Sequence, residues 1–115
     1  MAVPRYELLK LERTGHVATI TLNRPGKLNA LNSQMTAEFH SALDNLSDED
    51  DIRVVVLTGA GRGFCSGADV NELLEGSQAP SVTISETDIT ALSSHIRRTR
   101  QPVIAAVNGV AAGAG

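Results

Sequence analysis

The sequence has few of the features that mark secreted, membrane or nucleic-acid-binding proteins. Its single cysteine, Cys65, excludes an internal disulfide, which is consistent with a reducing compartment. The 10 Lys and Arg against 13 Asp and Glu give a formal charge of -3, and only residues 97–100 form a small basic cluster. No apolar run approaches the roughly 18 to 20 residues of a membrane helix, and residues 1–7 lack a secretory signal. We therefore expect a cytoplasmic protein that partners neither membranes nor nucleic acid.

The first half of the chain predicts two strands followed by a helix. Residues 6–11 and 17–22 have strand character, and the link between them is short enough for a hairpin. After a Pro-Gly turn at 23–27, a helix is expected to begin at Asn32 or Ser33, either of which can cap it. Its apolar side chains recur at steps of three and four residues, which predicts a face turned toward a core: Met35, Phe39, Ala42, Leu43 and Leu46.

The second half alternates strands and helices. Residues 52–58 include four consecutive aliphatic residues, which predicts a strand buried on both faces in a parallel or mixed sheet. A short helix is expected over 69–76, and a second one from residue 84 or 88 to residue 100. Pro102 starts a last strand, and its apolar run 103–107 also suits burial on both faces. The helices that would cover these strands are expected after residue 115, so the isolated chain is expected to expose apolar area and to aggregate or associate. The predicted order is β-β-α-β-α-α-β, in one α/β domain.

Two glycine-rich turns, at 58–69 and 108–115, each follow a strand. A turn of this kind usually opens a helix whose first N–H groups have no partner, and such groups suit an anion or a developing oxyanion. Two turns could therefore aim backbone donors at one point. The first turn also matches most of the Thr-Gly-x-x-x-Gly-x-Gly pattern, with Cys65 in place of the last glycine. A short-chain NAD(P)-dependent dehydrogenase is therefore kept as an alternative.

Four segments together resemble the enoyl-CoA hydratase/isomerase (crotonase) family in order and spacing. They are NRPGKLNAL at 23–31, VVVLTG at 54–59, GFCSGAD at 63–69 and PVIAAVNG at 102–109. The resemblance covers nearly the whole chain and is specific for the family, but not for one reaction within it. It implies an α/β, crotonase-like spiral of repeated β-β-α units. Residues 1–115 would form the N-terminal part of a single domain, ending before the C-terminal helices.

The resemblance also implies an acyl-CoA substrate and a function as an enoyl-CoA hydratase or isomerase. Relatives hold the thioester carbonyl with two backbone N–H groups, and by position these are the N–H groups of Ala68 and Ala114. Fixed donors of this kind lower the barrier to enolate formation by about 3 to 4 kcal/mol each. Small residues in both turns fit this role. The positions that match the CoA-binding segments of the family are Arg24, Lys27, Leu28, Ala30, Ser66, Gly67, Ala68, Asp69, Val70 and Asn71.

Further expectations follow from the same resemblance. The substrate is itself the CoA thioester, so no cofactor is expected, and the sequence shows no metal site. A full-length form is expected to be a homotrimer or hexamer. The two catalytic glutamates of the hydratases would fall beyond Gly115, so the 115-residue chain alone is expected to be inactive. The first alternative is therefore a non-catalytic remnant or fragment that binds at most ligand or a partner chain, and the dehydrogenase is the second.

Individual side chains carry simpler expectations. Glu72 and Glu75 lie on the short helix, where a base acts in some isomerase-like relatives, but solvent exposure is the simpler interpretation. Asp69 is expected to cap that helix through its carboxylate. Cys65 is expected to be a small apolar filler and not a nucleophile. The histidines have no ligand spacing and are expected at the surface: His16, His40 and His95.

Overall fold

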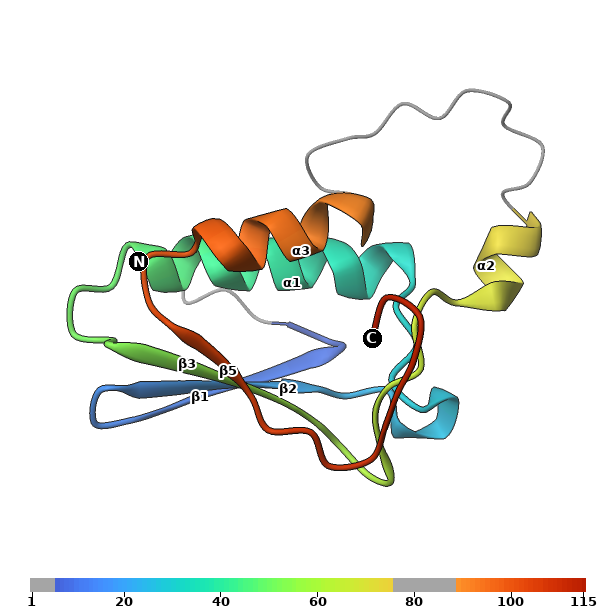
Figure 1. Ribbon diagram of the computed structural model, residues 1–115, viewed down its shortest axis with the longest axis horizontal. Helices are drawn as coiled ribbons and strands as arrows, with labels where there is room; N and C mark the ends of the chain where they lie inside the picture. The colour runs from blue at the N-terminus through green and yellow to red at the C-terminus, as the bar shows by residue number, and fades with distance from the viewer. Residues whose placement is uncertain (1–5, 76–88) are drawn as a thin grey trace.

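A computed structural model describes residues 6–75 and 89–115, in which two helices pack on one face of a sheet (Figure 1). The strands are β1 (Leu9–Thr14), β2 (Val17–Leu22), β3 (Val54–Gly59), β4 (Gly63–Cys65), β5 (Val103–Ala105) and β6 (Val110–Ala111). The helices are α1 (Ser33–Ser47), α2 (Val70–Glu75) and α3 (Ile89–Arg98), with a 3-10 turn η1 at Pro25–Lys27. The predicted elements are confirmed, and β4, β6 and η1 are additional. The helix start predicted at residue 84 or 88 lies outside the described residues.

Four strands form a mixed sheet in the order β1-β2-β3-β5, and β4 pairs with β6 in a second, two-stranded sheet. β1 and β2 are an antiparallel hairpin, whereas β2 with β3 and β3 with β5 are parallel. Parallel neighbours need a crossover connection, and α1 and α3 lie in these two connections. Both helices lie above the sheet in Figure 1, so the core forms between the sheet and these helices.

Helix α1 begins where the sequence predicts. The Asn32 Oδ1 atom accepts a hydrogen bond from the Met35 N–H at 2.8 Å, which satisfies one of the free donors of the first turn. The predicted apolar face is buried: Met35, Phe39, Ala42, Leu43 and Leu46. These side chains share one core with Ala18, Ile20 and Leu22, which alternate along β2.

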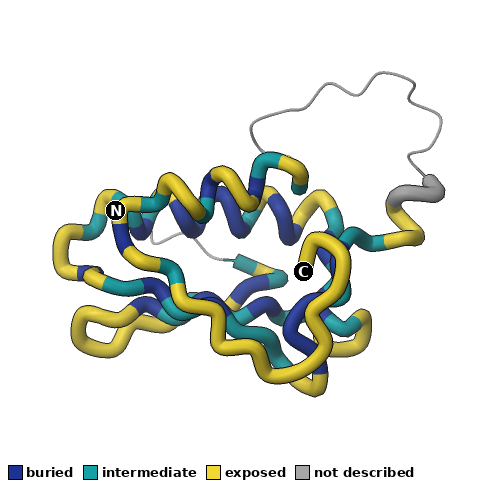
Figure 2. The backbone as a smooth tube through the Cα atoms, viewed as in Figure 1, coloured by how far each residue is buried: buried dark blue, intermediate teal, exposed yellow. Residues whose placement is uncertain are grey.

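The exposure of apolar area that is expected for the isolated chain is confirmed, because neither late strand is buried on both faces. In β3, Val55 and Leu57 are buried and face the helices, but Val54 and Val56 are only half-buried. In β5, Ile104 is 54% exposed, and the whole stretch from β5 to the end of the chain is exposed apart from Val103 (Figure 2). The cause is the placement of α1 and α3 on one side of the sheet, which leaves the opposite face without a helix among the described residues.

Two of the three histidines depart from expectation. His16 is exposed, but His40 on α1 and His95 on α3 are buried against each other, with ring centroids 4.9 Å apart. Their Nδ1 atoms are 2.6 Å apart, so one proton lies between them, and His95 Nε2 lies 2.8 Å from Asp44 Oδ1. A hydrogen-bonded polar pair can be buried at low cost, so these histidines join the two helices.

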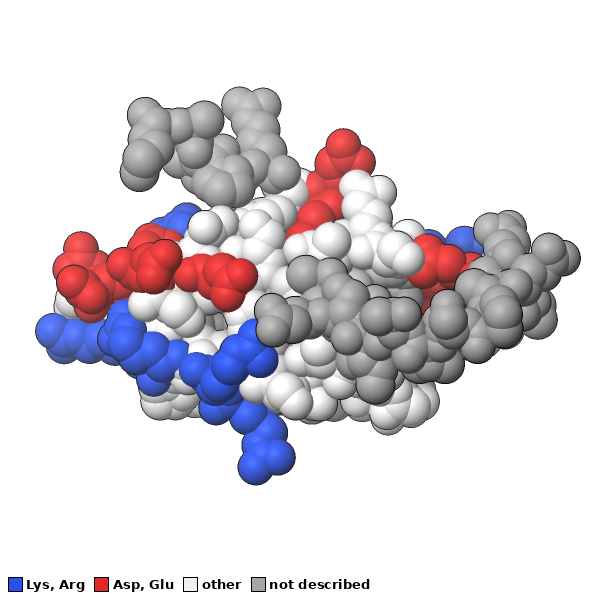
Figure 3. All heavy atoms as spheres, turned by 90° about the horizontal axis from the view of Figure 1, so that it is seen from above, with Lys and Arg blue, Asp and Glu red and all other residues white. Residues whose placement is uncertain are grey.

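Charged side chains are distributed over the surface in mixed groups. On the face seen in Figure 3, basic side chains at one end lie beside a row of acidic ones. Within the basic cluster, Arg97 and Arg98 are exposed, whereas Arg100 donates to the Ser47 and Glu49 carbonyl oxygens at the end of α1. The helices in the described parts of the chain are all too short or too polar to span a membrane.

Candidate functional site

Three segments leave the carboxyl ends of the parallel strands β2, β3 and β5. We call them the first segment (residues 23–31), the second segment (residues 60–69) and the third segment (residues 106–115). Parallel strands end at the same edge of a sheet, so the three segments meet there. Open α/β sheets bind their ligands outside this edge, which makes it the place to look for a site.

A buried asparagine joins the first segment to the second. Asn29 and the preceding Leu28 have left-handed φ values of 57° and 49°. Asparagine tolerates this conformation better than most residues. The Asn29 Nδ2 group donates to the carbonyl oxygens of Ala60 and Gly63 at 3.0 and 2.9 Å. Its Oδ1 accepts from the Arg24 N–H at 2.8 Å, so one side chain holds both segments together.

A second asparagine joins the third segment to the turn after β3. The Asn108 Nδ2 group donates to the carbonyl oxygens of Gly59 and Gly61 at 2.8 and 3.1 Å, and its Oδ1 accepts from the Gly59 N–H at 3.1 Å. Nδ2 also lies 3.3 Å from the Gly63 carbonyl oxygen. The glycines that suggested a dinucleotide-binding turn are therefore packed against two asparagine side chains of the chain itself.

The third segment lies along the second one. β6 runs parallel to β4, the Ala112 N–H donates to the Cys65 carbonyl oxygen at 3.1 Å, and the Gly115 N–H donates back to the Ala112 carbonyl oxygen at 2.7 Å. Gly113 takes the left-handed φ of 55°, and Ala114 is not among the residues with positive φ. Alanine at position 114 therefore needs no strained backbone.

The Ala68 N–H is turned away from Leu31 by the parallel bridge between these two residues. The Leu31 N–H donates to the Gly67 carbonyl oxygen at 2.7 Å, and the Leu31 carbonyl oxygen accepts from the Asp69 N–H at 3.0 Å. In a parallel bridge of this pattern, the residue whose two chain neighbours form the hydrogen bonds points its own N–H and C=O away from the partner strand. Ala68 is that residue.

Gly67 shows how closely the second and third segments approach each other. Its φ is 101°, and a Cβ atom placed on it would lie 2.8 Å from the Ala112 carbonyl oxygen and 3.4 Å from the Ala114 nitrogen. The Ala114 nitrogen is thus a direct neighbour of the residue that precedes Ala68. Neither the Ala68 N–H nor the Ala114 N–H has an acceptor within residues 6–75 and 89–115. Two free backbone donors therefore come from adjoining turns.

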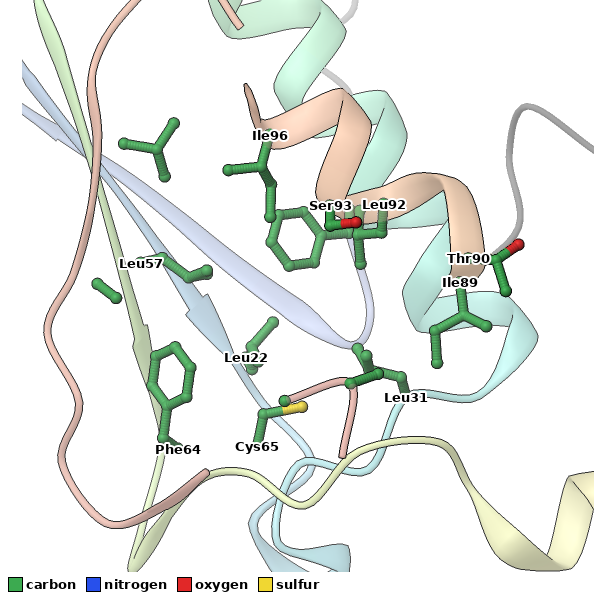
Figure 4. Close-up of a pocket in the computed structure, with 15 residues that line it drawn as sticks. Leu22, Leu31, Leu57, Phe64, Cys65, Ile89, Thr90, Leu92, Ser93 and Ile96 are labelled. Carbon is green, nitrogen blue, oxygen red and sulfur yellow. The ribbon is translucent and has the colours of Figure 1, made fainter. Parts of the chain in front are cut away.

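An apolar cavity of about 410 Å³ adjoins Ala114 and Gly115. In Figure 4, side chains from α3, β2, β3 and β4 surround this space, and its hydroxyl groups are those of Thr90 and Ser93 on α3. This cavity was not predicted from the sequence, because its walls come from separate segments with no common motif. Its main apolar walls are Leu22, Leu31, Leu57, Phe64, Leu92 and Ile96.

The positions expected to hold CoA lie together across the first and second segments. The Ser66 N–H donates to the Leu28 carbonyl oxygen at 3.0 Å, and the Ser66 Oγ lies 3.3 Å from the Lys27 carbonyl oxygen. Lys27, Val70 and Asn71 are exposed, whereas Leu28, Ala30, Ser66, Ala68 and Asp69 are half-buried and Gly67 is buried. Arg24, another of these positions, has a side chain that is only 13% exposed and is paired with Asp69.

The remaining candidates are engaged with their neighbours. Asp69 Oδ1 accepts from the N–H groups of Asn71 and Glu72 at 3.0 and 3.3 Å, which confirms the helix cap. The Glu72 N–H, followed by Arg24, lowers the pKa of the Asp69 carboxyl. Glu72 is exposed and accepts from the Ser33 N–H and hydroxyl group. Cys65 is buried, as expected, and burial raises the pKa of its thiol.

Comparisons with known proteins agree with this arrangement. A family model described as enoyl-CoA hydratase/isomerase matches residues 12–115. The chain belongs to the enoyl-CoA hydratase/isomerase family. This membership confirms the resemblance and leaves the dehydrogenase alternative without support. The solved structures that resemble the chain are crotonase-fold enzymes, so the α/β sheet and helices described above are part of the crotonase fold.

Individual members of the enoyl-CoA hydratase/isomerase family show the extent of the likeness. The chain is 45% identical over 102 residues to the 1,2-epoxyphenylacetyl-CoA isomerase of Escherichia coli, covering 86% of this chain and 39% of that protein. The structure of an enoyl-CoA hydratase from Bacillus anthracis matches with a TM-score of 0.83 and 34% identity, over 95% of this chain and 43% of that one. The structure of an enoyl-CoA hydratase from Mycobacterium marinum matches with a TM-score of 0.79 and 34% identity, covering 90% of this chain and 49% of that one. The chain therefore spans less than half of these relatives.

Proposed function

We propose that this chain is the acyl-CoA-binding part of an enoyl-CoA hydratase or isomerase, in which the Ala68 and Ala114 N–H groups hold the thioester carbonyl oxygen. One observation carries the proposal: two adjoining turns present backbone donors that have no acceptor among the described residues, and one of these donors, on Ala114, lies beside an apolar cavity. Membership of the family and the acyl-CoA substrate in the name of the Escherichia coli relative support it. Lys27 and Asn71, both exposed, would face the CoA, and the cavity would take the acyl chain.

The two donors suit the chemistry because both reactions develop negative charge on the same oxygen. In hydration, water adds its oxygen to C3 of a 2-enoyl thioester and a proton is delivered to C2. In isomerisation, a proton leaves one carbon and returns at another. Each path passes through a thioester enolate, and fixed N–H donors stabilise its oxygen by about 3 to 4 kcal/mol per donor. Glu72 is bonded to Ser33, so we assign it no proton-transfer role.

The chain itself is proposed to bind ligand without turning it over. A non-catalytic fragment or remnant, the first alternative, would behave in the same way. The distinction is experimental: a chain that binds crotonyl-CoA and leaves it unchanged is a binding module, whereas formation of 3-hydroxybutyryl-CoA shows a hydratase. Chromatography of the CoA thioesters after incubation with the chain separates the two outcomes.

Calorimetric titration tests binding directly. We expect heat of binding with crotonyl-CoA and none with NADH. Lys27→Ala should weaken the binding several-fold, because it removes a cation beside the CoA, whereas the matched control Lys10→Ala changes an exposed lysine on β1 and should have no effect. Binding of NADH alone, or equal binding by both variants and the wild-type chain, would contradict the proposed placement of CoA.

A further inference from the structure

The Arg24 side chain points into the protein and connects two segments. Its Nη1 atom donates to the Ala30 carbonyl oxygen at 2.6 Å and to Asp69 Oδ2 at 3.1 Å. Both charged side chains of the Arg24–Asp69 pair are only 13% exposed. A charged group this far removed from water is retained only where its partners are well placed. The pair is thus a fixed connection and not a loose surface ion pair.

The two acceptors of Arg24 flank the bridge that orients Ala68. Ala30 comes directly before Leu31, and Asp69 comes directly after Ala68. Leu31 in turn bonds to both neighbours of Ala68, at 2.7 Å to the Gly67 carbonyl oxygen and at 3.0 Å from the Asp69 N–H. The Arg24 guanidinium therefore connects the first and second segments next to the Leu31–Ala68 bridge, on the side where α2 begins.

The carboxylate of Asp69 divides its two oxygens between two tasks. Oδ1 caps α2 by accepting from the Asn71 and Glu72 N–H groups, while Oδ2 accepts from Arg24. The direction of the peptide between Gly67 and Ala68 is therefore fixed from three sides: by Leu31, by the start of α2 and by Arg24. Of these three, Arg24 is the contribution that can be removed without changing the helix cap.

We propose that Arg24 is a positioning residue that sets the direction of the Ala68 N–H toward the thioester carbonyl. The inference rests on the proposed function, because it assumes that this N–H acts on an acyl-CoA. This role differs from a direct contact between Arg24 and a CoA phosphate. A phosphate contact contributes to affinity, whereas a positioning residue changes how strongly the bound carbonyl is polarised. Displacements of about 1 Å at a reacting centre can change rates about 100-fold.

Infrared difference spectroscopy of bound crotonyl-CoA, labelled with ¹³C at the thioester carbonyl, separates these roles. The wild-type chain should shift the carbonyl stretch to lower frequency than in free crotonyl-CoA, because N–H donors polarise it. Arg24→Gln should lose most of this shift with little change in the dissociation constant. Arg24→Lys keeps the charge without the planar fork and should restore part of the shift. Arg13→Gln is the matched control, since Arg13 also pairs with a carboxylate, that of Glu49, but on the exposed surface.

Each outcome decides between the possibilities. An unchanged carbonyl shift in Arg24→Gln together with about tenfold weaker binding would identify Arg24 as a phosphate contact and overturn the inference. If the wild-type chain binds crotonyl-CoA without any carbonyl shift, the proposed function fails, and the inference fails with it. If circular dichroism shows that Arg24→Gln does not fold, Asp69→Asn decides. Its Oδ1 still caps α2, its amide no longer accepts from Arg24, and it should lose the shift in the same way.

Discussion

Replacing Gly67 by alanine tests the close approach of the second and third segments. A Cβ atom at this position would lie 2.8 Å from the Ala112 carbonyl oxygen, a backbone atom that can move only with its whole segment. The residue also has a φ of 101°, which residues with a side chain rarely adopt. Gly67→Ala therefore combines a conformational penalty with a steric one.

Two other glycines separate these contributions. Gly15 has a φ of 60° but no atom within 4 Å of the added Cβ, so Gly15→Ala should lose only the conformational term, about 1 to 2 kcal/mol. Gly26 has neither a positive φ nor a close neighbour, so Gly26→Ala should be neutral or stabilise by up to about 1 kcal/mol. For Gly67→Ala, about 1 to 3 kcal/mol of strain adds to about 1 to 3 kcal/mol of overpacking.

Urea denaturation of the four proteins, followed by circular dichroism at low protein concentration, measures the free energy of unfolding. The expected order of stability is Gly26→Ala and wild type first, then Gly15→Ala, then Gly67→Ala. Gly67→Ala should also lose binding of crotonyl-CoA, because the Ala114 N–H is displaced. A Gly67→Ala variant as stable as Gly15→Ala would refute the close contact between the two segments.

Three further predictions concern the rest of the chain. The pKa of Asp69 is lowered in the folded state, so this carboxylate stabilises the fold above its unfolded pKa of about 3.9 and ceases to do so as pH falls through the folded value. Asp69→Asn should therefore lose less stability between pH 5 and pH 3 than the wild type, measured by urea denaturation at each pH. An equal loss in both proteins would show that Asp69 does not contribute to the pH dependence of the free energy of unfolding. The Cys65 thiol, buried and with a raised pKa, should react with a thiol reagent at least about tenfold more slowly in the folded chain than in urea, and equal rates would contradict its burial. Ile104→Lys should reduce self-association in sedimentation velocity relative to the control Ser94→Lys, because Ile104 is an exposed apolar side chain; a monomeric wild type would count against this.

Local patterns predicted the helices and the central strands well. Helix α1 has a capping Asn32, an apolar stripe at the helical period and an acidic stretch after it, so several local preferences agree. β3 was equally clear as a strand. The burial of β3 was less clear from the sequence. An aliphatic run indicates that a strand can be covered on both faces, but the position of the helices decides whether it is covered.

The parts that were missed depend on contacts between distant residues. β4 and β6 are three and two residues long and have no alternation, so only their pairing with each other defines them. The burial of His40 depends on His95, 55 residues later, and the inward turn of Arg24 depends on Asp69, 45 residues later. The glycine-rich turns indicated that backbone donors could meet at this edge of the sheet, because that inference needs only backbone geometry, whereas the family resemblance assigned these donors to Ala68 and Ala114. The cavity beside Ala114 could not be inferred, since its walls come from separate segments.

A crystal structure of the chain with a bound enoyl-CoA would show whether both N–H groups hold the thioester carbonyl. The carbonyl oxygen should lie about 2.7 to 3.1 Å from both the Ala68 and the Ala114 nitrogen, with the acyl chain in the apolar cavity. A carbonyl oxygen that contacts neither nitrogen, or an acyl chain that lies outside the cavity, would contradict this placement.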